Sequence, residues 1–216
     1  MLMLTGMAII RPPRFGRHAF ATDFREVAAA TDPPTGWTKR WVSTTWTTTA
    51  NNALPGARGP RVSPGGANVC GLNRDEHGTA VTDCDVVTAV YLSSTGMQAG
   101  PVVRGQTGSN AGYVMQGDAT GANIQVVKPG VAILQTVAFA YSANTLYFMR
   151  LRIQGTTIQG KMWLATSAEP AGWNISTSDA SYASGFIGLS GYSANTCDFG
   201  WFAAAIGSGV AALPWG

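Results

Sequence analysis

The sequence predicts an all-β protein, a two-sheet antiparallel jelly-roll sandwich that follows an extended N-terminal arm. Only 12% of the 216 residues are charged, about half of the ~25% that is typical of globular domains, so long charged helical faces are not expected. Short apolar or alternating segments with turn residues between them indicate many strands. Because sandwiches of ~200–250 residues commonly form one domain, we assign residues 19–210 to the sandwich, 1–18 to the arm and 211–216 to a C-terminal tail.

The arm is predicted to be extended, basic and partly apolar. Its Arg-Pro-Pro-Arg run at 11–14 favours extended backbone, because proline fixes its own φ and restricts the residue before it. The arm holds three arginines and no acid, so the eleven basic residues of the remaining chain match its eleven acidic ones. Three arginines are too few to predict nucleic-acid binding. We therefore expect contacts with other subunits through Met1, Leu2, Leu4, Arg11, Arg14 and Arg17.

The N-terminal part of the domain alternates strand and turn signals. Residues 18–24 predict a strand with Phe20 and Phe24 on the same face. Residues 37–49 predict one or two strands, because they are rich in Thr and Trp, which suit a half-buried pleated surface. Residues 51–79 are rich in Gly and Pro, so we expect irregular structure with one short strand.

The C-terminal part carries clearer strand signals at regular spacing. The strongest is at 148–158, two alternating segments around a glycine-containing turn. Arg150 and Arg152 share one face of the first segment, which predicts a side exposed to water. The predicted strands are 85–93, 100–106, 112–116, 123–128, 131–141, 147–154, 157–165, 185–190 and 199–206.

The order of motifs in this half is similar to that of a known superfamily. A hairpin at 147–163 is followed by Glu-Pro-Ala-Gly-Trp at 169–173, Ser-Gly-Phe-Ile-Gly-Leu at 184–189 and Asp-Phe-Gly-Trp-Phe at 198–202. This order resembles the concanavalin A-like lectin/glucanase superfamily in its laminin-G-like form. The resemblance implies a jelly roll, and the superfamily includes glycan-binding modules, glycosidases and non-catalytic domains of bacteriophage particles. It does not choose among these functions.

The acidic residues argue against catalysis. A glycosidase needs two carboxylates across a cleft, ~5–5.5 Å or ~6.5–9.5 Å apart, and the catalytic strand of the resembling family places acids as E-x-D-x-x-E, a run that is missing here. Only Asp83 and Asp85 sit at strand spacing, and they lead into an apolar strand. The two histidines, His18 and His77, belong to no nucleophile or phosphate-binding motif. We therefore expect no enzymatic activity.

Metal binding has weak support in the sequence, and no cofactor is expected. Laminin-G-like domains often hold a calcium ion through carboxylates and backbone carbonyls, so the resemblance leaves calcium as an alternative, although no dense acidic loop is present. The candidate ligands are Asp83, Asp85, Asp179 and Asp198.

The cysteines Cys70, Cys84 and Cys197 match no zinc spacing and are too few for a disulfide framework. Two alternatives are open: three reduced thiols, or a Cys70–Cys84 bridge with one thiol left over.

Glycan binding would depend on aromatic rings that stack against sugar faces. Trp163, Trp201 and Phe202 lie in predicted strands and are assigned to the core. Other aromatic residues lie near turns or alternate with threonine, which favours exposure. These candidates are Trp37, Trp41, Trp173, Tyr182 and Tyr192.

The leading functional hypothesis is a non-catalytic virion structural or adhesion protein, a capsid decoration or a tail or fibre component of a bacteriophage. The order of charges at the N-terminus is not that of a secretory signal, and no segment approaches the ~18 apolar residues of a membrane helix. We therefore expect synthesis in the host cytoplasm, incorporation in the virion, and homo-oligomer or virion subunits as partners, with a host surface glycan as a further partner. The alternatives are a carbohydrate-binding module and, third, a glycoside hydrolase.

Overall fold

The structure is a computed structural model that describes residues 19–214 apart from positions 26, 29–30, 42–45, 51–57, 63–65, 97, 119 and 194–195. The N-terminal arm lies outside the described residues, so the predictions made for it stay predictions. They concern Met1, Leu2, Leu4, Arg11, Arg14 and Arg17.

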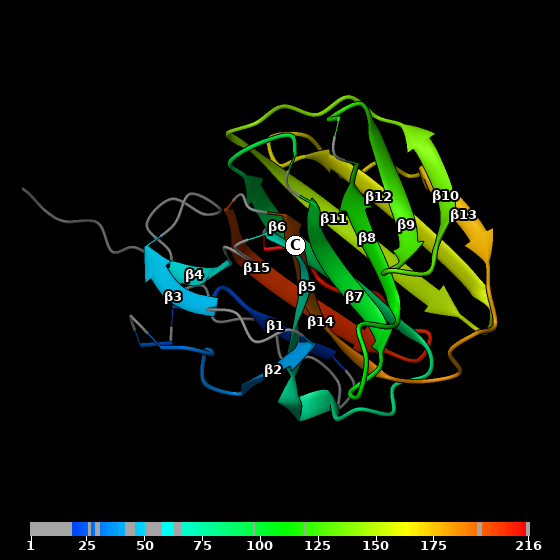
Figure 1. Cartoon of the computed structure of the whole chain (residues 1–216), viewed down its shortest axis with the longest axis horizontal. Coiled ribbons are helices and arrows are strands. Elements are labelled where there is room, and N and C mark those ends of the chain that lie inside the picture. Colours follow the sequence, from blue (N-terminus) through cyan, green and yellow to red (C-terminus); the bar gives the residue numbers. More distant parts are fainter. Residues whose placement is uncertain are drawn as a thin grey trace, which may run out of the picture.

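The described residues form two antiparallel sheets that pack face to face, which confirms the predicted all-β jelly-roll sandwich (Figure 1). The 8-stranded sheet A has the order β13-β12-β11-β6-β15-β4-β3, and β1 also pairs with β15. Its strands are β1 (Ala19–Thr22), β3 (Trp46–Ala50), β4 (Arg58–Val62), β6 (Cys84–Leu92), β11 (Thr145–Gln154), β12 (Thr157–Leu164), β13 (Ile175–Ser178) and β15 (Cys197–Ile206).

The 7-stranded sheet B has the order β10-β9-β8-β7-β14-β5-β2. Its strands are β2 (Trp37–Trp41), β5 (Gly66–Arg74), β7 (Gln98–Gly105), β8 (Tyr113–Gly117), β9 (Asn123–Lys128), β10 (Ala132–Ala138) and β14 (Phe186–Ser193). The helical structure of the described residues is limited to one short turn, η1 (Asp75–His77). No helix in this part of the chain is long and apolar enough to cross a membrane.

The predicted strands agree with the structure except in two places. Residues 51–79 were expected to hold one short strand, but β4 and β5 both lie there. Each of them pairs with strands on both sides, β4 with β3 and β15, and β5 with β2 and β14. Such pairing with distant strands overrides the low strand propensity of Gly and Pro. The short strand β13 was also missed, because its four residues, Ile-Ser-Thr-Ser, carry little apolar signal.

The core fills the space between the sheets. Met149 and Leu151 of sheet A and Met115, Val126 and Leu189 of sheet B are fully buried in it. Successive residues of a strand point to opposite faces. The neighbours of these core residues therefore face outward from the sandwich.

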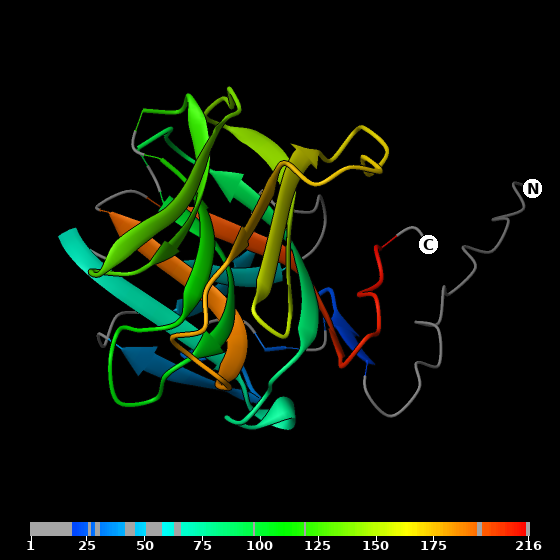
Figure 2. The same cartoon turned by 90° about the vertical axis from the view of Figure 1, so that its right-hand side faces the viewer.

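The outward face of sheet A is covered around Arg150, so the prediction of a water-exposed side is wrong for this residue. The side chain of Arg150 is 3% exposed, whereas that of Arg152 is 21% exposed. Asp85 is fully buried there and forms ion pairs with Arg150 (3.3 Å) and Arg152 (2.6 Å). Arg150 donates a hydrogen bond to the carbonyl of Ala211 (2.8 Å), so the C-terminal segment lies over this face (Figure 2). Burial raises the pKa of the Asp85 carboxyl, although both arginines oppose the shift.

Cys84 is a buried free thiol, so the Cys70–Cys84 bridge is not formed. Burial raises the pKa of the Cys84 thiol far above its ordinary value, with the nearby Asp85 carboxylate adding to the shift. Such a thiol behaves as a small apolar side chain of the core.

The turn between β8 and β9 is organised around the carboxylate of Asp118. This carboxylate accepts hydrogen bonds from the Gly121 amide (3.0 Å), the Thr120 hydroxyl (2.8 Å) and the Asn123 side-chain amide (2.7 Å). Desolvation alone would raise its pKa, but the hydrogen bonds outweigh this and lower the pKa from 3.8 to about 2. Asp118 thereby fixes the register of the β8–β9 hairpin.

We expect Asp85→Ala to lower the free energy of unfolding by about 3–5 kcal/mol, because it leaves Arg150 buried without its acidic partner on β6. The matched control Asp23→Ala removes an exposed ion pair with Arg25, and should cost less than about 1 kcal/mol. Urea unfolding of the two variants compares them directly. Equal losses would contradict the buried network.

We expect Asp118→Ala to lower the free energy of unfolding by about 1–3 kcal/mol near pH 7. Because folding depresses the Asp118 pKa, its contribution is present above the unfolded value of about 3.9 and is lost as the pH falls through about 2. The difference from wild type should therefore shrink on acidification. Unfolding curves measured across this pH range test it, and a difference that is independent of pH would refute the assignment.

Candidate functional site

The candidate site lies on the outward face of sheet B and follows from side-chain alternation in β8 and β9. Met115 and Val126 are register partners whose side chains lie in the core. Gln116 and Gln125, the next pair in the hairpin, are also register partners. Since alternate residues face opposite sides, both glutamines point outward.

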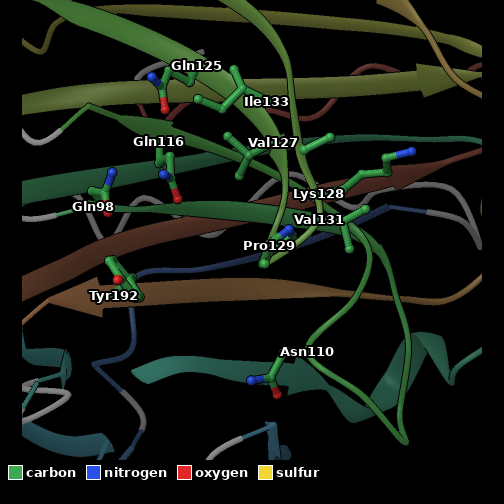
Figure 3. Close-up of a pocket in the computed structure, with 12 residues that line it drawn as sticks. Gln98, Asn110, Gln116, Gln125, Val127, Lys128, Pro129, Val131, Ile133 and Tyr192 are labelled. Atoms are coloured by element: carbon green, nitrogen blue, oxygen red, sulfur yellow. The ribbon is translucent and has the colours of Figure 1, made fainter. Parts of the chain in front are cut away.

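An open pocket with a volume of about 660 Å³ lies over this face. Its walls come from β7, β8, β9, β10 and β14, together with the β9–β10 turn and the loop between β7 and β8 (Figure 3). The volume is within the range of known ligand sites, about 300–1,000 Å³. The lining residues are Gln98, Asn110, Gln116, Gln125, Val127, Lys128, Pro129, Gly130, Val131, Ala132, Ile133 and Tyr192.

Three glutamines of this pocket have free side-chain amides. Within the described part of the chain, the side chains of Gln98, Gln116 and Gln125 form no hydrogen bond with another residue. Two other glutamines are used structurally: the amide of Gln106 donates to the carbonyls of Arg104 (2.9 Å) and Ser184 (2.8 Å), and that of Gln135 accepts from the Ser176 amide.

Gln116 is the most informative of the three because it is only 9% exposed. Its amide forms no hydrogen bond with another described residue, and its atoms are not among the buried side-chain atoms that lack a partner, so the amide reaches the open side of the pocket. The face of the pocket that carries Gln116 is therefore suited to a ligand that supplies both hydrogen-bond donors and acceptors.

The one basic group of the pocket is already neutralised. Lys128 donates hydrogen bonds to the carboxylate of Asp179 (2.8 Å) and the hydroxyl of Ser181 (2.9 Å). Asp179 also accepts from the Tyr113 hydroxyl (2.7 Å). Burial would raise the pKa of Asp179, but the bonds from Lys128, Ser181 and Tyr113 hold it well below its ordinary value. Burial and the Asp179 carboxylate raise the pKa of Tyr113 to about 12.

Two of the five aromatic candidates lie on this outward face. Tyr192 is half-buried, lines the pocket and is the register partner of Gln98. Trp41 is half-buried on β2 of sheet B, where its ring packs at a tilted angle against Phe186 (5.5 Å between centroids). The Trp41 ring lies so close to the backbone of β5 that a Cβ at Gly71 would come within 2.8 Å of it. Trp41 is not among the residues that line the pocket.

The other three aromatic candidates lie elsewhere. Trp37 is only 4% exposed and packs against Phe202 in the core, so its ring is out of reach of a glycan, which corrects its assignment. Tyr182 packs edge-on against Tyr113 (5.3 Å between ring centroids). Trp173 lies on the opposite side of the sandwich, over the cations of Arg152 (5.1 Å) and Lys161 (4.7 Å).

The four candidate calcium ligands do not come together. Each carboxylate has a basic partner: Asp83 pairs with Arg104, Asp85 with Arg150 and Arg152, Asp179 with Lys128, and Asp198 with Arg61. The part of the chain that the structure describes contains no cluster of His, Cys, Asp or Glu side chains able to hold a metal ion.

The glutamines that define this site were not predicted from the sequence. The signal was present as alternation, since Tyr-Val-Met-Gln-Gly at 113–117 and Asn-Ile-Gln-Val-Val at 123–127 place one polar residue between apolar ones. Polar residues on one face of a strand usually contact water. Only the pairing of β8 with β9 brings Gln116 beside Gln125.

The chain matches no protein-family model and no curated protein by sequence. Several solved structures share its fold. Carbohydrate-binding module CBM66 from Bacillus subtilis has a TM-score of 0.59 and 16% identity over 76% of this chain and 92% of that chain. A Bacillus subtilis protein of unknown function with a galectin-like fold has a TM-score of 0.57 and 9% identity, covering 87% and 94%.

The exoplasmic/lumenal domain of VIP36, in a Ca²⁺/Man-bound form, has a TM-score of 0.56 and 12% identity over 92% of this chain and 93% of that domain. Identities this low show the fold alone. The chain is therefore a lectin-like jelly-roll sandwich.

Proposed function

We propose that this protein is a non-catalytic carbohydrate-binding domain and that the pocket on sheet B binds the glycan. The observation that carries the proposal is the group of free amides of Gln98, Gln116 and Gln125 in one pocket. A primary amide both donates and accepts hydrogen bonds, which matches the hydroxyl groups of a sugar. Tyr192 supplies an aromatic ring at the same site, with an apolar face suited to a sugar ring.

The charge of the pocket favours a neutral sugar. Lys128 is the charged lining residue, and its ion pair with Asp179 cancels its charge. A glycan with carboxylate or sulfate groups would have to compete with Asp179 for the Lys128 ammonium. Neutral hexoses or pentoses face no such competition.

The proposal that the protein is non-catalytic is supported by where the described acids lie. The residues that line the pocket include no Asp or Glu. Among the described residues, Asp85, Asp179, Asp198 and Glu169 are held in ion pairs with arginine or lysine. Hydrolysis of a glycosidic bond needs two carboxylates that flank it.

Function in a virion stays a hypothesis within this proposal. Binding to a host surface glycan would suit an adhesion protein, and the pocket is the surface that would do it. The arm that would join the domain to other subunits lies outside the described residues.

A glycan array with purified protein tests the proposal, followed by titration calorimetry with the best-bound oligosaccharide. We expect Gln116→Ala to weaken binding roughly 5- to 100-fold, because it removes an amide that would hydrogen-bond the sugar hydroxyls. Gln154→Ala, a substitution of an exposed glutamine on β11, should leave affinity unchanged.

Two results would overturn the proposal. One is a protein that binds no saccharide on the array. The other is an affinity that falls equally in Gln116→Ala and Gln154→Ala, or only in Trp173→Ala on the far side of the sandwich.

A further inference from the structure

The sheet B pocket has two chemically distinct halves. Gln98, Gln116 and Tyr192 lie on one side in Figure 3, Ile133 and Val127 lie in the middle, and Pro129 and Val131 lie on the other side. Lys128 also lies beside Val131, with its ammonium paired to Asp179. The strand register explains this separation. Val127 pairs with Ile133 across β9 and β10, whereas Gln116 pairs with Gln125 across β8 and β9.

The apolar half is exposed to an unusual degree. Val131 is 68% exposed and Ile133 is 59% exposed, and both line the pocket. The other large apolar side chains of the described residues with comparable exposure are Leu164 and Val210, which lie outside it. Exposed apolar side chains that gather beside polar ligand groups mark a binding surface more often than isolated ones do.

We infer that the pocket recognises a glycan that carries an apolar substituent, an alkyl, acyl or aryl group. This inference rests on the proposed carbohydrate function of the same pocket. The glutamine half hydrogen-bonds the sugar hydroxyls, and Val127, Val131 and Ile133 bury the substituent. An unsubstituted sugar would fill the first half and leave Val131 and Ile133 in water.

Burial of the apolar substituent should raise the affinity of the ligand by a measurable factor. Burial of one methylene group against an apolar surface is worth about a fourfold gain in affinity. The hydroxyl groups of the ligand would bind the amides of Gln98 and Gln125, which are half-buried on sheet B. These hydrogen bonds would orient the sugar in the pocket.

The experiment compares methyl and butyl β-D-glucopyranoside, and the corresponding mannopyranosides and xylopyranosides, by titration calorimetry with the full chain. For the sugar that the protein binds, we expect the butyl glycoside to bind at least tenfold more tightly than the methyl glycoside. In the double variant Val131→Ser/Ile133→Ser this gain should disappear, while the affinity for the methyl glycoside stays within about twofold of wild type.

Two controls keep the outcome specific. Val210→Ser removes an equally exposed valine outside the pocket and should preserve the gain. Gln116→Ala should weaken the methyl and butyl glycosides by the same factor. Thermal unfolding checks that the double variant is folded.

The failures of the two proposals are distinguishable. Equal affinity for methyl and butyl glycosides, or no binding to any of them by a protein that binds a glycan on the array, overturns the substituent inference alone. A protein that binds no saccharide in either assay overturns the carbohydrate function as well.

Discussion

The structure depends on one constraint, the burial of alternate side chains between two sheets. Met115 and Val126 can reach the core only if their neighbours point away from it. The hydrophobic effect on one face of β8 and β9 therefore sets the chemistry of the other face. A shift of register by one residue would bring Gln116 into the core, at the cost of burying an amide without a partner.

The two outward faces of the sandwich are used differently. On sheet A, Phe148 and Trp163 stack together, and Ala211 of the C-terminal segment packs in the same apolar cluster. The Asp85 carboxylate accepts a bond from the Ala211 amide and anchors that segment. On sheet B, the loops leave a pocket over β7 to β10, lined by free amides and exposed aliphatic groups. A ligand has an accessible polar surface on sheet B, whereas the network of sheet A satisfies its own charges.

Much of the fold could be predicted from the sequence, because alternation and turn residues are local signals. The hairpin around Gly155 and the strands after residue 85 lie close to their predicted bounds. The prediction that Arg150 faces water was wrong. The residues that cover its side chain, Glu169 and Ala211, lie far along the chain. The full strand β5 was not predicted, because glycine has a low strand propensity. Its pairing with β2 and β14 depends on long-range contacts.

The site was harder to predict than the fold. Aromatic residues were chosen as glycan platforms by type, and type does not show which face of a strand a ring occupies. Trp37 faces the core, Trp41 and Tyr192 face outward on sheet B, and Trp173 covers cations on sheet A. The glutamines drew no attention because a single polar residue in a strand is ordinary. Their importance appears only when strand pairing gathers them and their amides prove to be free.

The central claim is that carbohydrate binds on the outward face of sheet B. Its most direct test is a nuclear magnetic resonance titration of the isotope-labelled protein with the oligosaccharide that it binds best. Changes in the side-chain amide signals of Gln98, Gln116 and Gln125, with little change at Gln154, are the result this account predicts. Changes centred on Trp173 and the outward face of sheet A would contradict it.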